Sequence, residues 1–240
     1  TMLDFFGPYE IRGEVQKRIT SKAYGVIFTD MVSRAVHIEA CFGYDTNNFM
    51  QALRRFTSHR GWPKEIYSDP GSQIVHTSKE LRLMWNQINK QTLLKVSTDS
   101  GLQWVFGPAD SPWYQGAVEA LVKSVKRCFK FSLNSQRLSS SEFSTFCYEV
   151  ANVLNERLIG YQQADDSEIN ILTPNCLLLG RPTSTRSLLQ VGDLPDQPPK
   201  HPRLGLVHLV CNKFWERWKE LIAPTMVKQQ KWKTPTRNFQ

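Results

Sequence analysis

Several features that would assign the chain to a common protein class are missing from its sequence. The five cysteines are odd in number and far apart, and none forms a CxxC pair. This argues for reduced thiols in an intracellular protein rather than for a disulfide framework. No apolar run approaches the roughly 18–20 residues of a membrane-spanning helix, and no amino-terminal signal pattern is present. Thr1 stands in place of an initiator Met, which indicates a fragment or a trimmed chain.

The composition that is present indicates a globular protein with a polyanionic partner. Hydrophobic residues make up 40% of the chain and aromatic residues 11%, which is enough for a packed core. Lys and Arg number 30 against 22 for Asp and Glu, so the net charge is +8. Such a surplus favours nucleic acid, because each neutralised phosphate releases condensed counterions. An anionic membrane surface would also attract it, but no spanning segment supports that alternative.

The first third of the chain alternates strand and helix signals. Apolar and alternating runs predict strands over residues 2–8, 24–29 and 35–40. A period of 3.6 residues predicts a helix over 47–60, and a brief strand is expected at 65–68. Three strands followed by a helix indicate a meander that begins a mixed sheet.

The rest of the chain reads mainly as helices and loops. Helices are predicted over residues 79–89, 115–132 and 140–158, with Ser140 or Ser141 as the N-cap of the last one. Short extended segments are expected at 93–96 and 102–106. Four prolines over 195–203 are typical of a linker. We therefore predict a core over 1–160, a loop-like linker over 161–205, an amphipathic helix over 206–223 and a basic mobile tail over 224–240.

Two acids stand at strand positions where ligand-binding residues are common. Asp4 lies inside the first apolar strand, where a carboxylate is costly to desolvate unless it is paired, hydrogen-bonded or bound to metal. Asp69 follows the strand at 65–68 and precedes Pro70, at the point where a strand opens into a loop. Each acid alone has an ordinary alternative, Asp69 as a turn residue and Asp4 as a polar edge-strand residue.

Glu119 is more informative because of its helix. At about 100° per residue, the apolar side chains of this helix fall on one stripe, which comprises Val118, Leu121, Val122, Val125 and Phe129. A second stripe comprises Glu119, Lys123, Lys126, Arg127 and Lys130, and residues 120–141 contain five basic residues and no acid. One acid at the head of a cationic row suits a metal at one end and a phosphate backbone along the rest. The alternative is a solvated face with an ordinary Glu119–Lys123 pair.

Short blocks in a fixed order carry a family resemblance over about residues 1–182. They are Asp4-Phe5-Phe6-Gly7-Pro8, Ala35-Val36-His37-Ile38-Glu39, Leu53-Arg54-Arg55-Phe56, Ile66-Tyr67-Ser68-Asp69, Gly116-Ala117-Val118-Glu119-Ala120, Val122-Lys123-Ser124-Val125-Lys126-Arg127, Leu172-Thr173-Pro174 and Gly180-Arg181-Pro182. In this order they resemble the integrases of retrotransposons, most closely those of the BEL/Pao type. A looser resemblance extends over the Trp-rich helix to about residue 222.

The resemblance implies an α/β, ribonuclease-H-like fold, in which helices flank a mixed sheet of about five strands and a helical extension follows. It also implies that three acids converge on two Mg²⁺ or Mn²⁺ ions. Asp4 would bridge both ions, Asp69 would bind one and Glu119 the other. Carboxylates suit such hard cations, and paired ions can activate an attacking hydroxyl and neutralise a leaving oxygen. No Ser/His/Asp or Cys/His arrangement indicates a covalent nucleophile instead.

The sequence departs from the family pattern beside Asp69. Pro70 and Gln73 stand where the family usually has Asn, and Pro70 removes an amide donor and a polar side chain from the neighbourhood of the metals. Asp69 and Glu119 are 119 − 69 = 50 positions apart, which is ordinary for the BEL/Pao type. Since all three acids are present, we expect metal binding to be retained.

Other residues near Glu119 are candidates for contacts with DNA. Trp113, Tyr114 and Gln115 precede it in an expected loop, where flat side chains can stack on unpaired DNA ends. His37 and Glu39 could assist the site, but satisfied sheet residues are the simpler interpretation.

The leading hypothesis is a metal-dependent polynucleotidyl transferase core that performs 3′-end processing and strand transfer for DNA integration. Its expected partners are element ends, target duplex and further copies of the chain, in the nucleus. One alternative is a domesticated module of the same fold that binds nucleic acid or assembles complexes without catalysis. A structure-selective nuclease is a third.

Overall fold

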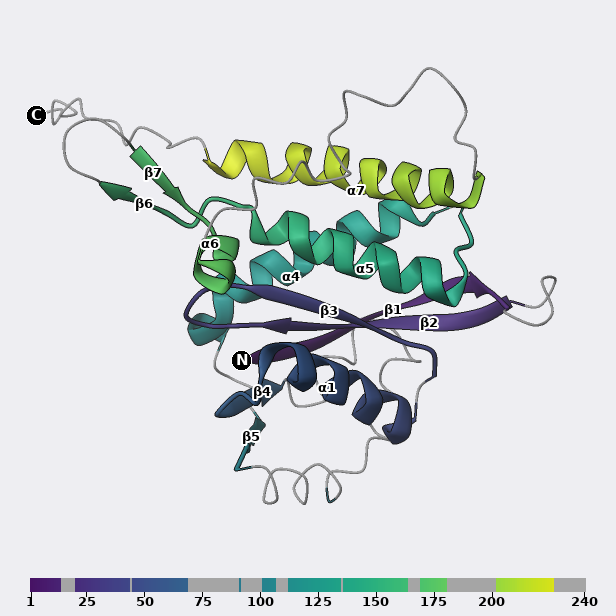
Figure 1. The fold of residues 1–240 in the computed structure, drawn as a ribbon, viewed down its shortest axis with the longest axis horizontal. Coiled ribbons are helices and arrows are strands. Elements are labelled where there is room, and N and C mark those ends of the chain that lie inside the picture. Colours follow the sequence, from purple (N-terminus) through teal and green to yellow (C-terminus); the bar gives the residue numbers. More distant parts are fainter. Residues whose placement is uncertain are drawn as a thin grey trace, which may run out of the picture.

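A five-stranded sheet forms the centre of the computed structural model, with helices on both faces (Figure 1). The structure describes residues 1–13, 20–43, 45–68, 91, 101–106, 112–134, 136–163, 169–180 and 202–226. The helix predicted over 79–89 and the segment predicted over 93–96 lie outside these residues. The sheet comprises β1 (Met2–Arg12), β2 (Thr20–Thr29), β3 (Val36–Cys41), β4 (Glu65–Ser68) and β5 (Gln103–Phe106).

The strand order is β3-β2-β1-β4-β5, so β1 is the central strand. β1 pairs antiparallel with β2, and β2 pairs antiparallel with β3. β4 runs parallel to β1 on one side and to β5 on the other. This is the mixed, helix-flanked sheet of five strands that the sequence predicted, and the α/β fold class is confirmed.

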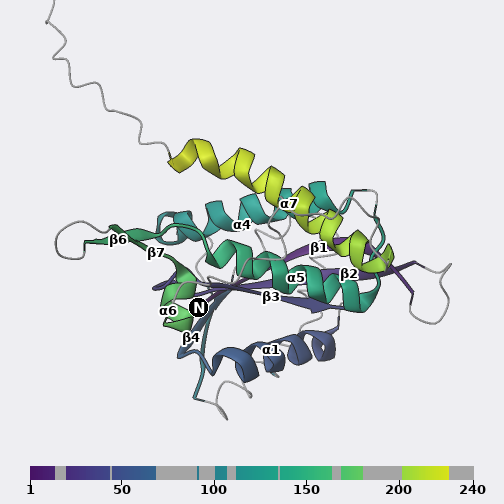
Figure 2. The same cartoon turned by 45° about the horizontal axis from the view of Figure 1, so that its top comes forward.

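Helices cover the two faces unequally. α1 (Thr46–Arg60) lies on one face, and α4 (Pro112–Ser132), α5 (Ser140–Asn155) and α7 (Pro202–Met226) lie on the other (Figures 1 and 2). Because successive strand residues point to opposite faces, β1 contributes to two separate hydrophobic clusters. Met2 and Phe6 join the cluster under α4, α5 and α7, whereas Leu3 and Phe5 join the cluster under α1.

The start of α5 differs from the prediction by one residue. The N-cap is Ser139 rather than Ser140 or Ser141, because Ser139 and Glu142 form a reciprocal capping box. Glu142 also accepts hydrogen bonds from Arg203 on α7. The capping residues thus help to hold the C-terminal helix against α5.

Part of the segment predicted as a loop is folded, so that prediction is wrong over its first portion. β6 (Gly160–Gln163) and β7 (Ile169–Leu172) form a two-stranded antiparallel sheet, and α6 (Pro174–Leu179) follows. Thr173 caps α6 and Pro174 occupies its first turn, where a missing N–H costs nothing. Residues 181–201 lie outside the described residues, so the predicted linker and the domain division remain predictions.

The C-terminal helix is longer than its predicted range of 206–223 and is packed on the core. α7 spans Pro202–Met226, and the rest of the predicted tail, from residue 227, lies outside the described residues. The ring of Phe214, with no exposed surface, lies 5.7 Å from that of Phe129 on α4 and 6.2 Å from that of Phe146 on α5. None of the described helices combines the length and apolarity needed to cross a membrane.

The free edge of β3 is closed by polar side chains from helices on both faces. Asn155 of α5 bonds both the backbone N–H and the C=O of Val36, at 2.7 and 2.8 Å, as a neighbouring strand would. Glu39, which is 1% exposed, accepts hydrogen bonds from Arg55 of α1 and Tyr148 of α5 and pairs with His37 on its own strand. His37 and Glu39 are therefore satisfied sheet residues.

Replacing Phe214 by Ala should lower the free energy of unfolding by about 3–5 kcal/mol, because the ring is buried between two helices. Denaturant unfolding measures the change. Leu209→Ala is the matched control on the same helix, since Leu209 is 45% exposed, and it should change stability by no more than about 0.5 kcal/mol. Equal effects of the two substitutions would show that α7 is not docked as described.

The buried Glu39 network should make the fold sensitive to acid. Burial would raise the pKa of Glu39, but hydrogen bonds from His37 and Arg55 outweigh it and hold the pKa below its ordinary value of 4.5. The ionised form therefore stabilises the fold fully above pH 4.5, and that contribution is lost as the pH falls through the lower, folded-state pKa.

Glu39→Gln should accordingly cost about 1–2 kcal/mol at neutral pH, and the difference from wild type should shrink below pH 4.5. Urea unfolding over a pH series measures both quantities. Glu216→Gln, at an exposed position of α7, is the control and should leave the pH profile unchanged. If the difference in unfolding free energy between wild type and Glu39→Gln persisted undiminished in acid, it would contradict the ionised network.

Candidate functional site

Asp4 projects from the central strand toward the face that α4 covers. It alternates with Met2 and Phe6, both of which pack in the cluster on that face. Its carboxylate is 21% exposed and has two partners. Oδ1 accepts a hydrogen bond from the backbone N–H of Phe5 at 2.7 Å, and Oδ2 accepts one from Nζ of Lys126 at 2.7 Å. The carboxylate is thus held rigidly, with a cation against one oxygen.

The apolar stripe predicted on α4 is the face that docks on the sheet. Val122, Val125 and Phe129 are buried in the cluster that contains Met2 and Phe6, and Leu121 packs against it. Cys128 belongs to the same buried face, although the predicted stripe did not include it. The ring of Phe129 lies 4.7 Å from that of Phe6, edge to face. These contacts fix the distance and rotation of α4 relative to β1.

Glu119 lies on the same side of α4 as the lysine that binds Asp4. It is partly exposed and precedes Lys126 by seven residues, which is two helical turns or about 10 Å along the helix axis. Residues separated by seven share a helix face. Glu119 therefore lies on the same side of α4 as Lys126, which contacts Asp4 on the sheet.

Asp69 lies outside the described residues, but the strand that leads to it is described. Ser68, the residue before it, pairs with Leu3, the residue before Asp4. Trp104 of β5 donates a hydrogen bond from Nε1 to Oγ of Ser68 at 2.9 Å, which fixes the end of β4 in the sheet. The carboxyl end of β4 is therefore anchored beside Asp4.

The four cations predicted on α4 differ in their surroundings. Lys126 is 25% exposed and engaged with Asp4. Lys123, Arg127 and Lys130 are exposed. The stripe on α4 is consequently not one solvated face, because one of its members belongs to the carboxylate site.

The loop predicted for Trp113, Tyr114 and Gln115, at the border with the helix, is wrong. Their backbone belongs to α4, which already begins at Pro112. Proline suits the first helical position because its fixed φ matches the helix and its missing N–H would have no partner there. The proposed DNA contact of these three side chains remains a prediction.

The cysteines do not provide a nucleophile at this site. All five are free, and burial raises the pKa of the Cys41 and Cys128 thiols to about 12. A thiol with such a pKa is protonated and unreactive at neutral pH. In the part of the chain that the structure describes, no group of three His, Cys, Asp or Glu side chains is arranged to hold a metal ion.

The donor chemistry at Asp4 nevertheless fits a divalent cation. Carboxylate oxygens are the ligands that Mg²⁺ and Mn²⁺ prefer. Oδ2 of Asp4 already faces a positively charged group, the Lys126 ammonium, so this oxygen points to a position that accepts a cation. Glu119 supplies a second carboxylate on the same side of α4.

No protein-family model and no curated protein matches the chain, but solved structures do. The intasome of simian T-cell lymphotropic virus, in complex with PP2A regulatory subunit B56 gamma, matches with a TM-score of 0.42 and 13% identity over 82% of this chain. This chain covers 58% of that one. The HTLV-2 integrase catalytic core domain, in complex with magnesium in a trimeric form, matches with a TM-score of 0.37 and 14% identity, over 66% of this chain and 87% of that chain.

Proposed function

We propose that the chain is the catalytic core of an integrase of the BEL/Pao retrotransposon type. The observation that carries the proposal is the position of Asp4: a carboxylate on the central strand, facing a cation, opposite the helix that bears Glu119. The pairing of Ser68 with Leu3 supports Asp69, which is bonded to Ser68, as the third member. The order of short sequence blocks supports the family assignment.

In this proposal Asp4, Asp69 and Glu119 hold two Mg²⁺ or Mn²⁺ ions. When bound, such ions activate a water or 3′-hydroxyl and neutralise the leaving oxygen of a phosphodiester. The chain's own contribution is orientation. The Phe5 N–H fixes one oxygen of Asp4, and the apolar face of α4 holds Glu119 at a set height above the sheet.

The remaining partners follow from the same proposal. Element ends and target duplex are the DNA substrates, and Trp113, Tyr114, Gln115, Lys123, Lys126, Arg127 and Lys130 contact them. Assembly of several copies and a nuclear location belong to the same hypothesis.

A second candidate is a domesticated DNA-binding or assembly module that keeps the fold without turnover. Two observations favour it: Lys126 occupies one oxygen of Asp4, and Pro70 replaces a polar neighbour of Asp69. The two candidates differ in whether the carboxylates are needed for chemistry, which variants can test.

Asp4→Asn and Glu119→Gln should each reduce Mn²⁺-dependent nicking and strand transfer on DNA by about a hundredfold or more, because each removes a metal ligand worth several kcal/mol of charge stabilisation. Glu216→Gln, a surface acid on α7, is the control and should retain activity. Equal cleavage by wild type and Glu119→Gln would exclude the enzymatic proposal. DNA binding without cleavage by the wild type would favour the second candidate.

Replacing Lys126 should strengthen metal binding, because a divalent ion at Asp4 must displace the ammonium from Oδ2. Lys126 and Asp4 are 25% and 21% exposed, so solvent weakens the pair to about 0.5–1 kcal/mol, and Lys126→Met should tighten Mn²⁺ binding about two- to fivefold. Calorimetric titration of Mn²⁺ measures the effect without relying on activity. Lys64→Met, at an exposed position after α1, should leave the affinity unchanged, and weaker Mn²⁺ binding to Lys126→Met would refute the displacement.

A further inference from the structure

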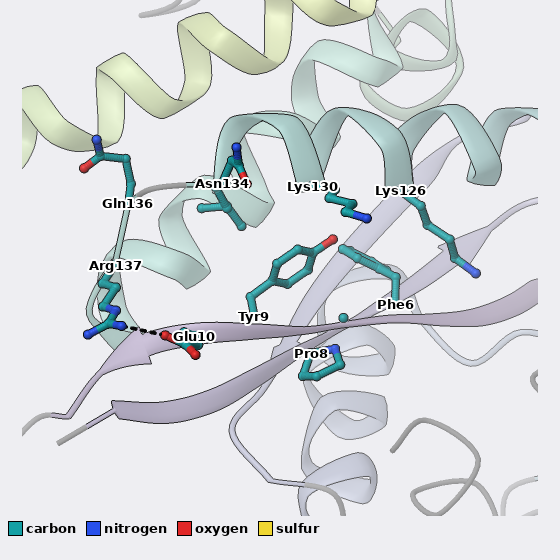
Figure 3. Close-up of a pocket in the computed structure, with 11 residues that line it drawn as sticks. Phe6, Pro8, Tyr9, Glu10, Lys126, Lys130, Asn134, Gln136 and Arg137 are labelled. Atoms are coloured by element: carbon teal, nitrogen blue, oxygen red, sulfur yellow. Dashed lines mark ion pairs between the residues drawn. The ribbon is translucent and has the colours of Figure 1, made fainter. Parts of the chain in front are cut away.

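A groove of about 580 Å³ begins at Lys126 and extends away from Glu119, between α4 and the second half of β1 (Figure 3). On the helix side, Lys126 and Lys130 project toward the strand, and on the strand side lie Tyr9 and Glu10. Asn134, Gln136 and Arg137 line the far end. A backbone hydrogen bond from the N–H of Arg12 to the C=O of Leu138 joins the two walls there.

The strand wall of the groove is the half of β1 that follows its described pairing with β4. β4 pairs with β1 only at Met2 and Leu3, so among the described residues no strand covers the same edge of β1 beyond that point. Pro8 and Tyr9 provide the apolar part of the wall. The groove is therefore formed by the second half of β1, the end of α4 and the segment that follows α4.

The charges in the groove favour an anion. Three cations, Lys126, Lys130 and Arg137, line it, against one acid, Glu10. Glu10 pairs with Arg137 at 2.8 Å, but both side chains are about 60% exposed, at 62% and 60%, so this pair is weak and can open. The amides of Asn134 and Gln136 add neutral hydrogen-bonding groups beside the cations.

The shape favours a chain of phosphates over a single anion. Lys126 and Lys130 are one helical turn apart, about 6 Å along the axis, and Arg137 lies beyond them on the segment before α5. Cations in a row suit successive phosphates of one strand, whereas a compact anion would need them to converge on one point. Lys126 also contacts Asp4, so the row runs directly from the carboxylate site.

We infer that this groove binds the phosphodiester backbone of one DNA strand that leaves the carboxylate site, with Lys126, Lys130 and Arg137 as its phosphate contacts. The inference rests on the proposed function for the identity of the strand. It adds Arg137 and the β1 wall to the DNA surface and separates them from Lys123 and Arg127, which do not line the groove. Glu10 competes with the phosphate for Arg137.

The competition by Glu10 allows a sharp test by a double-mutant cycle. Fluorescence anisotropy with a labelled single-stranded DNA oligonucleotide, without divalent ions, measures the affinity of the full chain. Lys130→Ala and Arg137→Ala should each weaken binding about three- to tenfold and lower the slope of log affinity against log salt by about one. Lys64→Ala, an exposed lysine that follows α1, controls for net charge.

Glu10→Gln should tighten binding about two- to threefold, because it frees Arg137 for phosphate and removes a repulsive charge. Part of that gain should vanish when Arg137 is also replaced by Ala. The groove would be overturned as a strand site if the effects of Glu10→Gln and Arg137→Ala on affinity were fully additive. Equal losses of affinity for Lys64→Ala and Arg137→Ala would overturn it as well. If polyglutamate bound as tightly as DNA and showed the same coupling between Glu10 and Arg137, the groove would be a general anion site and the assignment to DNA would be overturned.

The outcome is separable from that of the proposed function. DNA binding is measured without metal and without turnover. If the Glu10 and Arg137 variants are coupled as expected but the wild type shows no strand transfer, the groove stands and the chain is a DNA-binding module. If the wild type performs strand transfer but the effects of the Glu10 and Arg137 variants are additive, the proposed activity stands and the groove is not a strand site.

Discussion

The docking of α4 on the central strand is the contact on which the rest of the site depends. Phe129 packs edge to face on Phe6, and the space for the Phe6 ring exists because residue 25 on the paired strand is glycine: a Cβ there would lie 2.1 Å from the ring. Two residues before Phe6, Asp4 faces the same helix and meets Lys126. Because strand and helix periods are both fixed, the position of this one aromatic pair sets the height and rotation at which Glu119 and Lys126 lie relative to the sheet.

Much of this arrangement could be predicted from the sequence, since it depends on periodicity. The first three strands, the helix predicted over 47–60 and the part of the α4 stripe that the structure describes (Leu121, Val122, Val125 and Phe129) all agree with the structure. Asp4 and Glu119 could be singled out because a carboxylate inside an apolar strand, and a lone acid before a row of cations, are unusual. The shared face of Glu119 and Lys126 was also accessible from their spacing of seven residues, although their sequence separation from Asp4 concealed the ion pair.

The errors lie where one residue determines the local conformation. Pro112 lets α4 begin before Trp113, so a segment interpreted as a loop is helical. Glu142 selects Ser139 as the cap of α5 by bonding back to its backbone. Thr173 and Pro174 start a short helix in a segment that was predicted to be loop-like. Signals of this kind are local and present in the sequence, but composition averaged over a window hides them. The groove could not be predicted, because it depends on how α4 and the segment after it lie against the second half of β1, which is far away in the sequence.

The ion pair between Asp4 and Lys126 has consequences for both sides of the site. A carboxylate on a central strand under a helix would be costly without a counter-charge, and Lys126 supplies one from the cationic row itself. The same ammonium lines the groove, so when a cation takes its place at Asp4 it can move to a phosphate without leaving α4. Lys126 would then link binding of a cation at the carboxylate site to binding of the DNA strand in the groove. Arg137 and Glu10 repeat the arrangement at the far end of the groove, where a cation is again held by an acid that an incoming phosphate can replace. Lys126 and Arg137 are thus compensated by acids in the absence of DNA, and both become available when a phosphate displaces those acids.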